Sequence, residues 1–506
     1  MEKYYITTAI VYASGKPHIG NVYEVVLADS IARYKRLKGF DVYFQTGTDE
    51  HGEKVHIKAQ ENNVTEQDYV DNISKIVREN YDMLNISYDS FARTSDIKHK
   101  EIVSNIFQKL YDKGDIYKDV YEGWYCIPCE SFYTDLQLID GKCPDCGRNV
   151  EKKKEESYFL KLSNYTDKLL DYIEKNPLFL QPDFRKTEII NNFIKPGLQD
   201  LCVTRSSFDW GVKVPFDKNN VIYVWIDALS NYITFLDYDI NNKSEKFNKY
   251  WPADLQIIGK DIYRFHAIYW PILLLALEEE LPKTIFGHQW LISDKEKMSK
   301  SRGNVLYADE LVNDFGLDQI RYYILSSMPI TSDGLISKEL IKEKINSDLA
   351  NTLGNLINRT IAMSLKYFDG IVKKTGKNDE IDNKFIEEVS KTPKKVDEAI
   401  EKTNISLALS NIIDLARICN KYIDDTTPWI LAKDENYDKL NNVLYNIIES
   451  IRIIGILLKP FLPDTSNKII NSINTKIISY DSIYKFGNLE NNITVEKIDI
   501  LFTRIE

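Results

Sequence analysis

The chain has 506 residues, of which 43% are hydrophobic and 28% charged, and a net charge of -11. This composition is typical of a soluble globular protein and excludes a fibrous or largely disordered one. At roughly 150 residues per domain, about three domains are expected. The acidic balance excludes indiscriminate binding to nucleic acid, because that binding depends on Lys and Arg neutralising phosphates. An RNA partner would need local basic patches, and residues 152–154 and 295–302 are candidates.

The N-terminal residues favour a cytoplasmic location. The start, MEKYYITTAIVY, lacks the basic segment and continuous apolar stretch of a secretory signal. The most apolar run, Ala267 to Leu277, contains Pro271 and is shorter than the roughly 20 residues that span a bilayer. We therefore expect a buried helix there and no membrane partner.

The first elements are a strand, a helix and a second strand. KYYITTAIVYAS is an apolar strand, and apolar residues recur at helical spacing from Val22 to Lys38. After Gly39, FDVYFQTGTDEHG is another apolar strand that ends in a polar loop. This order predicts a parallel α/β sheet, whose ligands lie beyond the carboxyl ends of its strands.

A short polar loop with His18, Gly20 and Asn21 precedes this first helix. The N–H groups at a helix N-terminus can hold a phosphate, and His and Asn side chains can donate hydrogen bonds to its oxygens. A loop that merely caps the helix is the alternative, and this motif alone does not exclude it.

Residues from about 62 to 113 are expected to be helical, and a cysteine-rich hairpin follows them. Two Cys-x-x-Cys pairs, Cys126/Cys129 and Cys143/Cys146, can direct four thiolates to one point, the ligand set of a closed structural zinc site. Chance pairs or a redox dithiol are the alternatives, although a thioredoxin-like motif has one pair on a βα unit. The pattern predicts one structural Zn²⁺ bound by four cysteines.

After the hairpin, NNVIYVWIDALSNYITF and DLQIIGKDIYRFHAIYWPILLLAL resume the alternation of strand and helix, so the hairpin region is an insertion in the sheet domain. A basic loop follows, SDKEKMSKSRGN, whose Lys297, Lys300 and Arg302 suit a polyphosphate. Beyond about Ile341, helical periodicity dominates, and the last third is expected to be a helical bundle.

Together, PHIGN and KMSKS are the pair of motifs that marks class I aminoacyl-tRNA synthetases, and the sequence resembles that class. More closely, it resembles the methionyl-tRNA synthetases, from ITTAIVYASGKPHIGN to the terminal LFTRIE. TGTDEHGEKV, the four-cysteine hairpin, VWIDALSNY, GKDIYRFHAIYWP, KMSKSRGN and TPWILAK carry the resemblance. One residue departs from it: Asn21 stands where the usual motif has a second histidine, and an amide cannot become cationic.

The resemblance implies a Rossmann-type parallel-sheet catalytic domain with an inserted zinc-binding connective domain, followed by an α-helical bundle that binds the anticodon. The expected boundaries are 1–115 for the first catalytic half, 116–215 for the connective insertion with its zinc knuckle, 216–290 for the second catalytic half, 291–345 for the KMSKS loop and stem-contact region, and 346–506 for the anticodon-binding domain.

The implied activity is that of a methionine–tRNA ligase. The enzyme would activate L-methionine with ATP to methionyl-adenylate and pyrophosphate, with Mg²⁺ accompanying ATP, and transfer methionine to the 3′-terminal adenosine of tRNA(Met), both initiator and elongator. The acting unit would be a monomer. Relatives specific for Ile, Val or Leu carry a large editing domain, for which the interval between Lys154 and Tyr223 is too short. A zinc-ribbon RNA-binding protein without catalysis is the alternative from another class.

The resemblance also assigns residues. The methionine-binding residues would be Ala9, Ile10, Tyr12, Asp49, Trp225, Ala228, Tyr232, Ile262, Phe265 and His266, with Asp49 on the substrate ammonium and the Tyr12 hydroxyl and His266 near the sulfur. The ATP-binding residues would be His18, Gly20, Asn21, Gly259, Asp261, His288, Lys297, Met298, Ser299 and Lys300, of which His18, Asn21, Lys297 and Lys300 would be catalytic. Asn355, Arg359 and Trp429 would read the anticodon.

Overall fold

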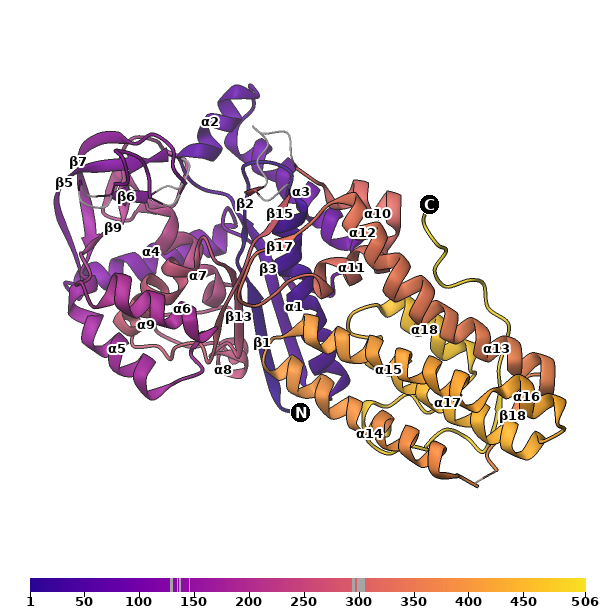
Figure 1. The fold of residues 1–506 in the computed structure, drawn as a ribbon. Helices are drawn as coiled ribbons and strands as arrows, with labels where there is room; N and C mark the ends of the chain where they lie inside the picture. Colours follow the sequence, from indigo (N-terminus) through magenta and orange to yellow (C-terminus); the bar gives the residue numbers. More distant parts are fainter. Residues whose placement is uncertain are drawn as a thin grey trace. The chain divides into compact units, whose positions relative to one another are not determined.

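The structure is a computed structural model that describes residues 1–127, 131–133, 135, 138–144, 146–293, 296–297, 305–375 and 377–506. Its contacts divide the chain into two compact units, whose elements are labelled in Figure 1. Unit 1 comprises Met1–Pro17 and Asp41–His288, and unit 2 comprises His18–Phe40 and Gln289–Glu506. Helix α1 (Ile19–Leu37) therefore belongs to unit 2, although two strands of unit 1 flank it in the sequence.

Unit 1 is built on a seven-stranded sheet in the order β2-β3-β1-β13-β14-β8, with β4 beside β3, and every pairing in it is parallel. Its strands are β1 (Lys3–Thr8), β2 (Val11–Tyr12), β3 (Asp41–Asp49), β4 (Ser90–Arg93), β8 (Leu180–Gln181), β13 (Leu255–Gly259) and β14 (Ile285–His288). Ile6 of β1 pairs with Phe44 of β3 on one side and with Leu255 of β13 on the other. All five residues of β13 are buried, as expected for a parallel strand covered on both faces. The predicted parallel α/β sheet is confirmed.

Helices connect these strands. They are α2 (Glu53–Glu61), α3 (Glu66–Met83), α4 (Ile97–Asp112), η3 (Leu162–Tyr165), α5 (Thr166–Lys175), α6 (Asp183–Ile189), the π-helix η4 (Ile190–Ile194), α7 (Val224–Thr234), α8 (Glu245–Tyr250), the π-helix η5 (Phe265–Tyr269) and α9 (Trp270–Leu277). The apolar run that ends in α9 is a buried helical segment, as predicted. The prediction of helices throughout 62–113 is wrong at β4, because this four-residue strand is too short to show a period and is fixed by its pairing with β3.

Unit 1 also contains two smaller antiparallel sheets. One has the order β6-β5-β7-β9, from β5 (Ile116–Cys126), β6 (Ser131–Tyr133), β7 (Glu151–Leu160) and β9 (Leu201–Cys202). The other joins β10 (Thr204–Arg205), β12 (Asp217–Ile222) and β11 (Lys213–Val214). Between β7 and β9 the chain returns to the main sheet, because β8 pairs with β14. The segment that follows the cysteine hairpin is therefore interrupted once by a strand of the parallel sheet.

Unit 2 is mostly helical. Besides α1 it contains β15 (Leu291–Ser293), β16 (Glu296–Lys297), α10 (Ala308–Phe315), α11 (Leu317–Ser326), β17 (Gly334–Leu335), α12 (Lys338–Lys344), the π-helix η7 (Ile345–Gly354), α13 (Asn355–Phe368), β18 (Ile371–Lys373), α14 (Glu380–Glu401), α15 (Ile405–Thr426), α16 (Pro428–Lys433), α17 (Tyr437–Leu458), α18 (Pro463–Ser472), η8 (Tyr480–Tyr484) and β19 (Asn492–Thr494). Among the described residues, α17 alone is long and apolar enough to cross a membrane, but 94% of its apolar window is buried inside the protein. It is the central helix of the predicted bundle, packed against α15, α18 and α14.

Candidate active site

The candidate residues of unit 1 gather where the parallel strands end. Asp49 is the last residue of β3, Gly259 of β13 and His288 of β14, while Ala9 and Ile10 directly follow β1. Gly259 and His288 lie opposite each other in register. Ligands of parallel α/β sheets bind beyond this edge, so the sheet places these residues where the sequence predicts a site.

An aromatic group lies on α7 and η5. The indole of Trp225 stacks on the ring of Phe265 with 3.8 Å between centroids and 12° between planes. Trp225 also contacts His266 edge-on, and the indole Nε1 is buried with no hydrogen-bond partner in the described structure. Phe265 and His266 belong to a π-helix, an irregularity common at functional sites. Together these rings form an apolar wall, in which the Nε1–H of Trp225 is a hydrogen-bond donor without a partner in the described structure.

His266 is neutral in the folded protein. Its Nδ1 donates to the carbonyl oxygen of Ile262 at 3.1 Å, so its Nε2 accepts from the hydroxyl of Tyr232 at 2.8 Å. Burial lowers the pKa of His266 to about 4, although the bond to the Ile262 carbonyl acts in the other direction. Tyr232 supplies the hydroxyl that bonds His266, and Tyr12, whose hydroxyl is expected with His266 near the substrate sulfur, lies opposite Asp49 in the β2–β3 pair.

This pKa predicts how stability depends on pH. Between pH 6.5 and pH 4 the unfolded chain binds a proton at residue 266 that the folded chain excludes, so stability is full above pH 6.5 and falls as the pH decreases. From pH 7 to pH 5 the free energy of unfolding should fall by about 2 kcal/mol through this residue. Urea unfolding of the wild type and His266→Gln at both pH values measures it, and equal pH dependence in the two proteins would contradict the assignment.

A buried carboxylate that the sequence analysis did not single out fixes the loop after Asp49. Asp227 of α7 accepts hydrogen bonds from His51 Nδ1 at 2.6 Å and from His99 Nε2 at 2.8 Å, and Nδ1 of His99 lies 2.7 Å from the hydroxyl oxygen of Thr234. Burial alone would raise the pKa of Asp227, but the two histidines outweigh it and lower the pKa to about 2. The bond to His51 ties the loop to the helix that carries the aromatic wall.

In unit 2 the His18 loop caps helix α1. The N–H of Gly20 donates to Nδ1 of His18 at 3.1 Å, and the N–H of His18 donates to Oδ1 of Asn21 at 3.2 Å. Because Nδ1 accepts, the proton of neutral His18 is on Nε2, and the Asn21 amide keeps its NH₂ group as a donor. The N–H of Ile19 bonds the carbonyl of Leu306 at 2.9 Å. Capping and phosphate binding are therefore compatible, since they use different atoms of the same side chains.

The basic loop is described only at its beginning. Lys297 lies on β16, whose backbone pairs antiparallel with β15, Lys297 opposite Ile292. Met298, Ser299 and Lys300 lie outside the described residues, and so does Arg302. Lys297 and His18 belong to unit 2, whereas the aromatic group belongs to unit 1.

Three of the predicted metal ligands lie together. The sulfur atoms of Cys126, Cys143 and Cys146 are all within 4.8 Å of one another, and those of Cys126 and Cys146 are 3.6 Å apart. A tetrahedral zinc with Zn–S bonds of about 2.3 Å requires sulfur atoms about 3.8 Å apart, close to the distance between Cys126 and Cys146. Cys129, the predicted fourth ligand, lies outside the described residues.

The predicted anticodon residues lie on two helices of unit 2. Asn355 and Arg359 are one turn apart on α13, and Arg359 donates to Asp424 at 2.9 Å. Trp429 on α16 is 45% exposed, whereas tryptophan side chains are on average highly buried. The indole is therefore accessible on the surface of unit 2.

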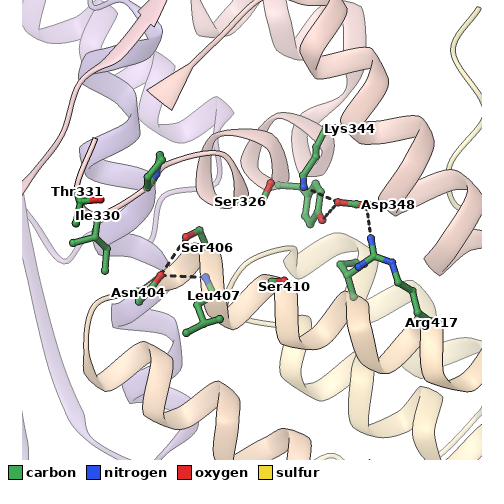
Figure 2. A pocket seen from close by; sticks show the side chains of 13 residues that line it. Ser326, Ile330, Thr331, Lys344, Asp348, Asn404, Ser406, Leu407, Ser410 and Arg417 are labelled. Atoms are coloured by element: carbon green, nitrogen blue, oxygen red, sulfur yellow. Dashed lines mark hydrogen bonds and ion pairs between the residues drawn. The ribbon is translucent and has the colours of Figure 1, made fainter. Parts of the chain in front are cut away.

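Unit 2 also has a pocket of about 610 Å³ that no motif of the sequence predicts (Figure 2). In it, Asp348 of η7 accepts from the Tyr322 hydroxyl at 2.7 Å, from Lys344 at 2.9 Å and from Arg417 at 2.8 Å. Burial would raise the pKa of Asp348, but these donors lower it. The network joins α11, η7 and α15 at the pocket wall.

Comparisons with known proteins agree with this arrangement. A family model described as "tRNA synthetases class I (M)" matches residues 4–153 and 146–361, and one described as "Anticodon binding domain of methionyl tRNA ligase" matches 372–506. The chain is 54% identical over 506 residues to a methionine–tRNA ligase of Clostridium acetobutylicum and 50% identical over 519 residues to one of Bacillus subtilis, covering 100% and 99% of this chain and 78% of each relative.

The solved structures include the methionyl-tRNA synthetase of Mycobacterium tuberculosis in complex with methionyl-adenylate. It superposes with a TM-score of 0.95 at 38% identity over 99% of this chain and 100% of that one. The apo form of the same enzyme gives a TM-score of 0.86 at 36% identity, over 100% and 99% of the two chains. By sequence, domain models and fold, the chain belongs to the methionyl-tRNA synthetase family of class I tRNA synthetases.

Proposed function

We propose that the chain attaches methionine to tRNA. The methionine carboxylate attacks the α-phosphorus of ATP and expels pyrophosphate, and a hydroxyl of the 3′-terminal adenosine of tRNA then takes the methionyl group from the adenylate. One observation carries the proposal: the stacked wall of Trp225 and Phe265, with neutral His266 beside it, lies on elements tied to the loop that follows Asp49. An ammonium, a flexible thioether and a carboxylate match a site with one carboxylate and an apolar wall.

Different side chains bind the ammonium and the side chain of methionine. Asp49 pairs with the ammonium, and Ala9, Ile10, Tyr12, Trp225, Ala228, Tyr232, Ile262, Phe265 and His266 enclose the side chain. Because the Tyr232 hydroxyl donates its hydrogen to Nε2 of His266, this bond fixes the orientation of the O–H group. A site of this kind selects methionine by shape and by weak contacts to sulfur.

Charge develops on the phosphoryl oxygens as pyrophosphate leaves, and preorganised donors stabilise it. We assign this role to the Nε2–H of His18, the amide of Asn21, Lys297 and Lys300. Gly20, Gly259, Asp261, His288, Met298 and Ser299 complete the ATP site. Mg²⁺ enters with ATP, because this ion binds mainly through phosphate oxygens and its own waters.

We propose that Zn²⁺ is bound by Cys126, Cys143 and Cys146 together with Cys129. The proposal is supported by the three described sulfur atoms, which lie within 4.8 Å of one another, and four thiolates leave the ion no open position for substrate. Its role is to hold the hairpin between β5 and β7 in one conformation.

The proposed organisation follows the sequence: 1–115 and 216–290 for the catalytic sheet, 116–215 for the connective insertion, 291–345 for the KMSKS and stem-contact region and 346–506 for anticodon binding. We propose a monomer, because one chain supplies every candidate residue, and a cytoplasmic enzyme that charges initiator and elongator tRNA(Met) alike. Binding of RNA without catalysis is not supported, since the relatives that match the full chain are ligases.

The direct test is the formation of methionyl-tRNA. Purified protein, ATP and a tRNA(Met) transcript should yield product with labelled methionine, and leucine, isoleucine or valine should yield far less. Product with one of these competitors in place of methionine would keep the class of enzyme and overturn the proposed pocket.

Trp429 should matter for tRNA and not for adenylation. If the exposed indole stacks on an anticodon base, Trp429→Ala should lower kcat/KM for tRNA by about 10- to 100-fold, since such stacking is worth about 1–3 kcal/mol. Methionine-dependent exchange between ATP and pyrophosphate should stay unchanged. Ile430→Ala, equally exposed beside it, is the matched control. Equal losses in both assays would make Trp429 structural.

A further inference from the structure

Helix α1 is hydrogen-bonded to the rest of unit 2 at its N-terminus, in its middle and at its C-terminal end. At its N-terminus the N–H of Ile19 donates to the carbonyl of Leu306 at 2.9 Å. In its middle, Asp29 pairs with Arg321 of α11 at 2.7 Å, and both side chains are fully buried. The same guanidinium donates to the carbonyl of Phe461, between α17 and α18, at 2.9 Å. The helix that begins at the His18 loop is therefore part of the helical unit.

A tyrosine cluster bonds the C-terminal end of α1. We use this term for Asp397 of α14 with Tyr34, Lys38, Tyr480 and Tyr484. The carboxylate accepts from the hydroxyls of Tyr34 at 2.9 Å, Tyr480 at 2.7 Å and Tyr484, and Lys38 lies 3.4 Å from it. The rings of Tyr34 and Tyr480 meet edge-on with 5.6 Å between centroids. One carboxylate thus joins α1, α14 and η8.

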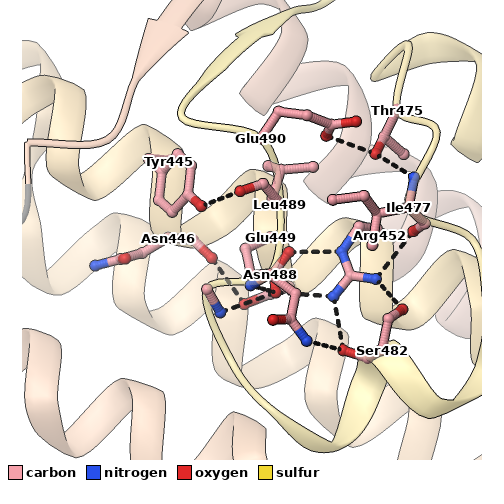
Figure 3. Close-up of polar contacts among 12 residues, drawn as sticks. Tyr445, Asn446, Glu449, Arg452, Thr475, Ile477, Ser482, Asn488, Leu489 and Glu490 are labelled. Carbon is pink, nitrogen blue, oxygen red and sulfur yellow. Dashed lines mark hydrogen bonds and ion pairs between the residues drawn. The ribbon is translucent and has the colours of Figure 1, made fainter.

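The η8 side of the cluster is itself fixed to the central helix α17, as Figure 3 shows. The side chains of Glu449 and Arg452 are fully buried and bonded to each other at 2.6 Å. Arg452 donates to the carbonyl of Ile477 at 3.1 Å and to the hydroxyl of Ser482 at 2.7 Å, and Glu449 accepts from the N–H of Gly487 at 2.9 Å. Because these bonds hold the chain at residues 477, 482 and 487, Tyr480 and Tyr484 cannot shift independently of α17.

We propose that Asp397 is a positioning residue for adenylation: it fixes the tilt of α1 on the helical unit and thereby the place of the His18 loop. The proposal rests on the proposed function of that loop. Tyr34 is sixteen residues from His18, about 24 Å at 1.5 Å per residue, so a tilt of about 2° moves the loop by about 1 Å. A displacement of that size can cost about 100-fold in rate. The unit that carries the predicted anticodon residues thus also carries the His18 loop.

The test is Asp397→Asn in the full chain, assayed without tRNA by methionine-dependent ATP–pyrophosphate exchange. The carboxamide has no negative charge and only one acceptor oxygen. The hydroxyls of the three tyrosines and the Lys38 ammonium can then no longer all bond residue 397. We expect kcat/KM for ATP to fall by about 10-fold, below the limit for a 1 Å displacement, and KM for methionine to stay unchanged. Tyr484→Phe removes the hydroxyl that donates to Asp397 and accepts from Lys38 at 2.7 Å, at a side chain that is 42% exposed, and should show a smaller change of the same kind.

Asp382→Asn is the matched control, because Asp382 lies on the same helix in a similar network without α1. It accepts from the Tyr422 hydroxyl at 2.6 Å, from Lys439 at 2.7 Å and from the Asn442 amide at 2.9 Å. This variant should unfold at a lower temperature than the wild type, and its kcat/KM for ATP should be unchanged.

Two results would overturn the proposal: normal ATP kinetics in Asp397→Asn, or equal loss for ATP and methionine. If Asp397→Asn does not fold, normal ATP kinetics in Tyr484→Phe would overturn it in the same way. A wild type without methionine-dependent exchange would instead count against the proposed function.

Discussion

His18→Ala should lower kcat of methionine-dependent ATP–pyrophosphate exchange by about 10²- to 10³-fold, the usual loss when one preorganised donor to developing charge is removed. The reason is the assignment of its protons: Nδ1 accepts from the N–H of Gly20, so Nε2 carries the hydrogen that can face a phosphoryl oxygen. KM for methionine should change little. Exchange kinetics at saturating methionine measure the effect.

His18→Ser separates catalysis from capping. Serine caps helices well, so the start of α1 should remain stable, whereas an alanine cap costs about 1 kcal/mol. A short hydroxyl does not reach the place of Nε2, and the loss of rate should equal that of His18→Ala. A serine variant with the rate of the wild type would show that His18 only caps the helix.

Asp49→Asn should lower kcat/KM for methionine by about 10- to 100-fold, because a hydrogen bond between charged groups is worth about 1.5–3 kcal/mol. Asp49 is the last residue of β3 and is 9% exposed, so asparagine fits the same space without the charge. KM for ATP should stay the same. Steady-state exchange with each substrate varied in turn gives both values.

A methionine analogue without the amino group is the control for Asp49. It lacks the ammonium, so it should inhibit the wild type and Asp49→Asn with the same Ki. A Ki that worsens in the variant as much as the KM for methionine would mean that Asp49 shapes the pocket and does not bind the ammonium.

Sequence periodicity predicted the parallel sheet and the helical bundle because both rest on local patterns of apolar residues. The helix predicted from Val22 begins at Ile19, since the His18 and Asn21 caps extend it by one turn beyond the apolar pattern. The membership of α1 in unit 2 could not be predicted, because it depends on contacts such as that of Tyr34 with Asp397, which are 363 positions apart.

Site residues could be predicted where they form a local sequence motif. They could not be predicted where a hydrogen bond joins two residues that are far apart in the sequence. The pairs Cys126/Cys129 and Cys143/Cys146 predicted one shared metal ion, and the sulfur atoms of Cys126, Cys143 and Cys146 do lie together. By contrast, Asp227 bonds His51 across 176 positions, and an isolated Asp and His give no signal in one sequence. Such bonds follow from the folded topology and not from local spacing.

Amino-acid-dependent ATP–pyrophosphate exchange, with purified protein and each of the twenty amino acids, tests the central claim most directly. Asp49 and the Trp225–Phe265 wall of unit 1 predict exchange with methionine far above the others. Exchange led by another amino acid, or none with any of them in zinc-replete protein, would contradict it.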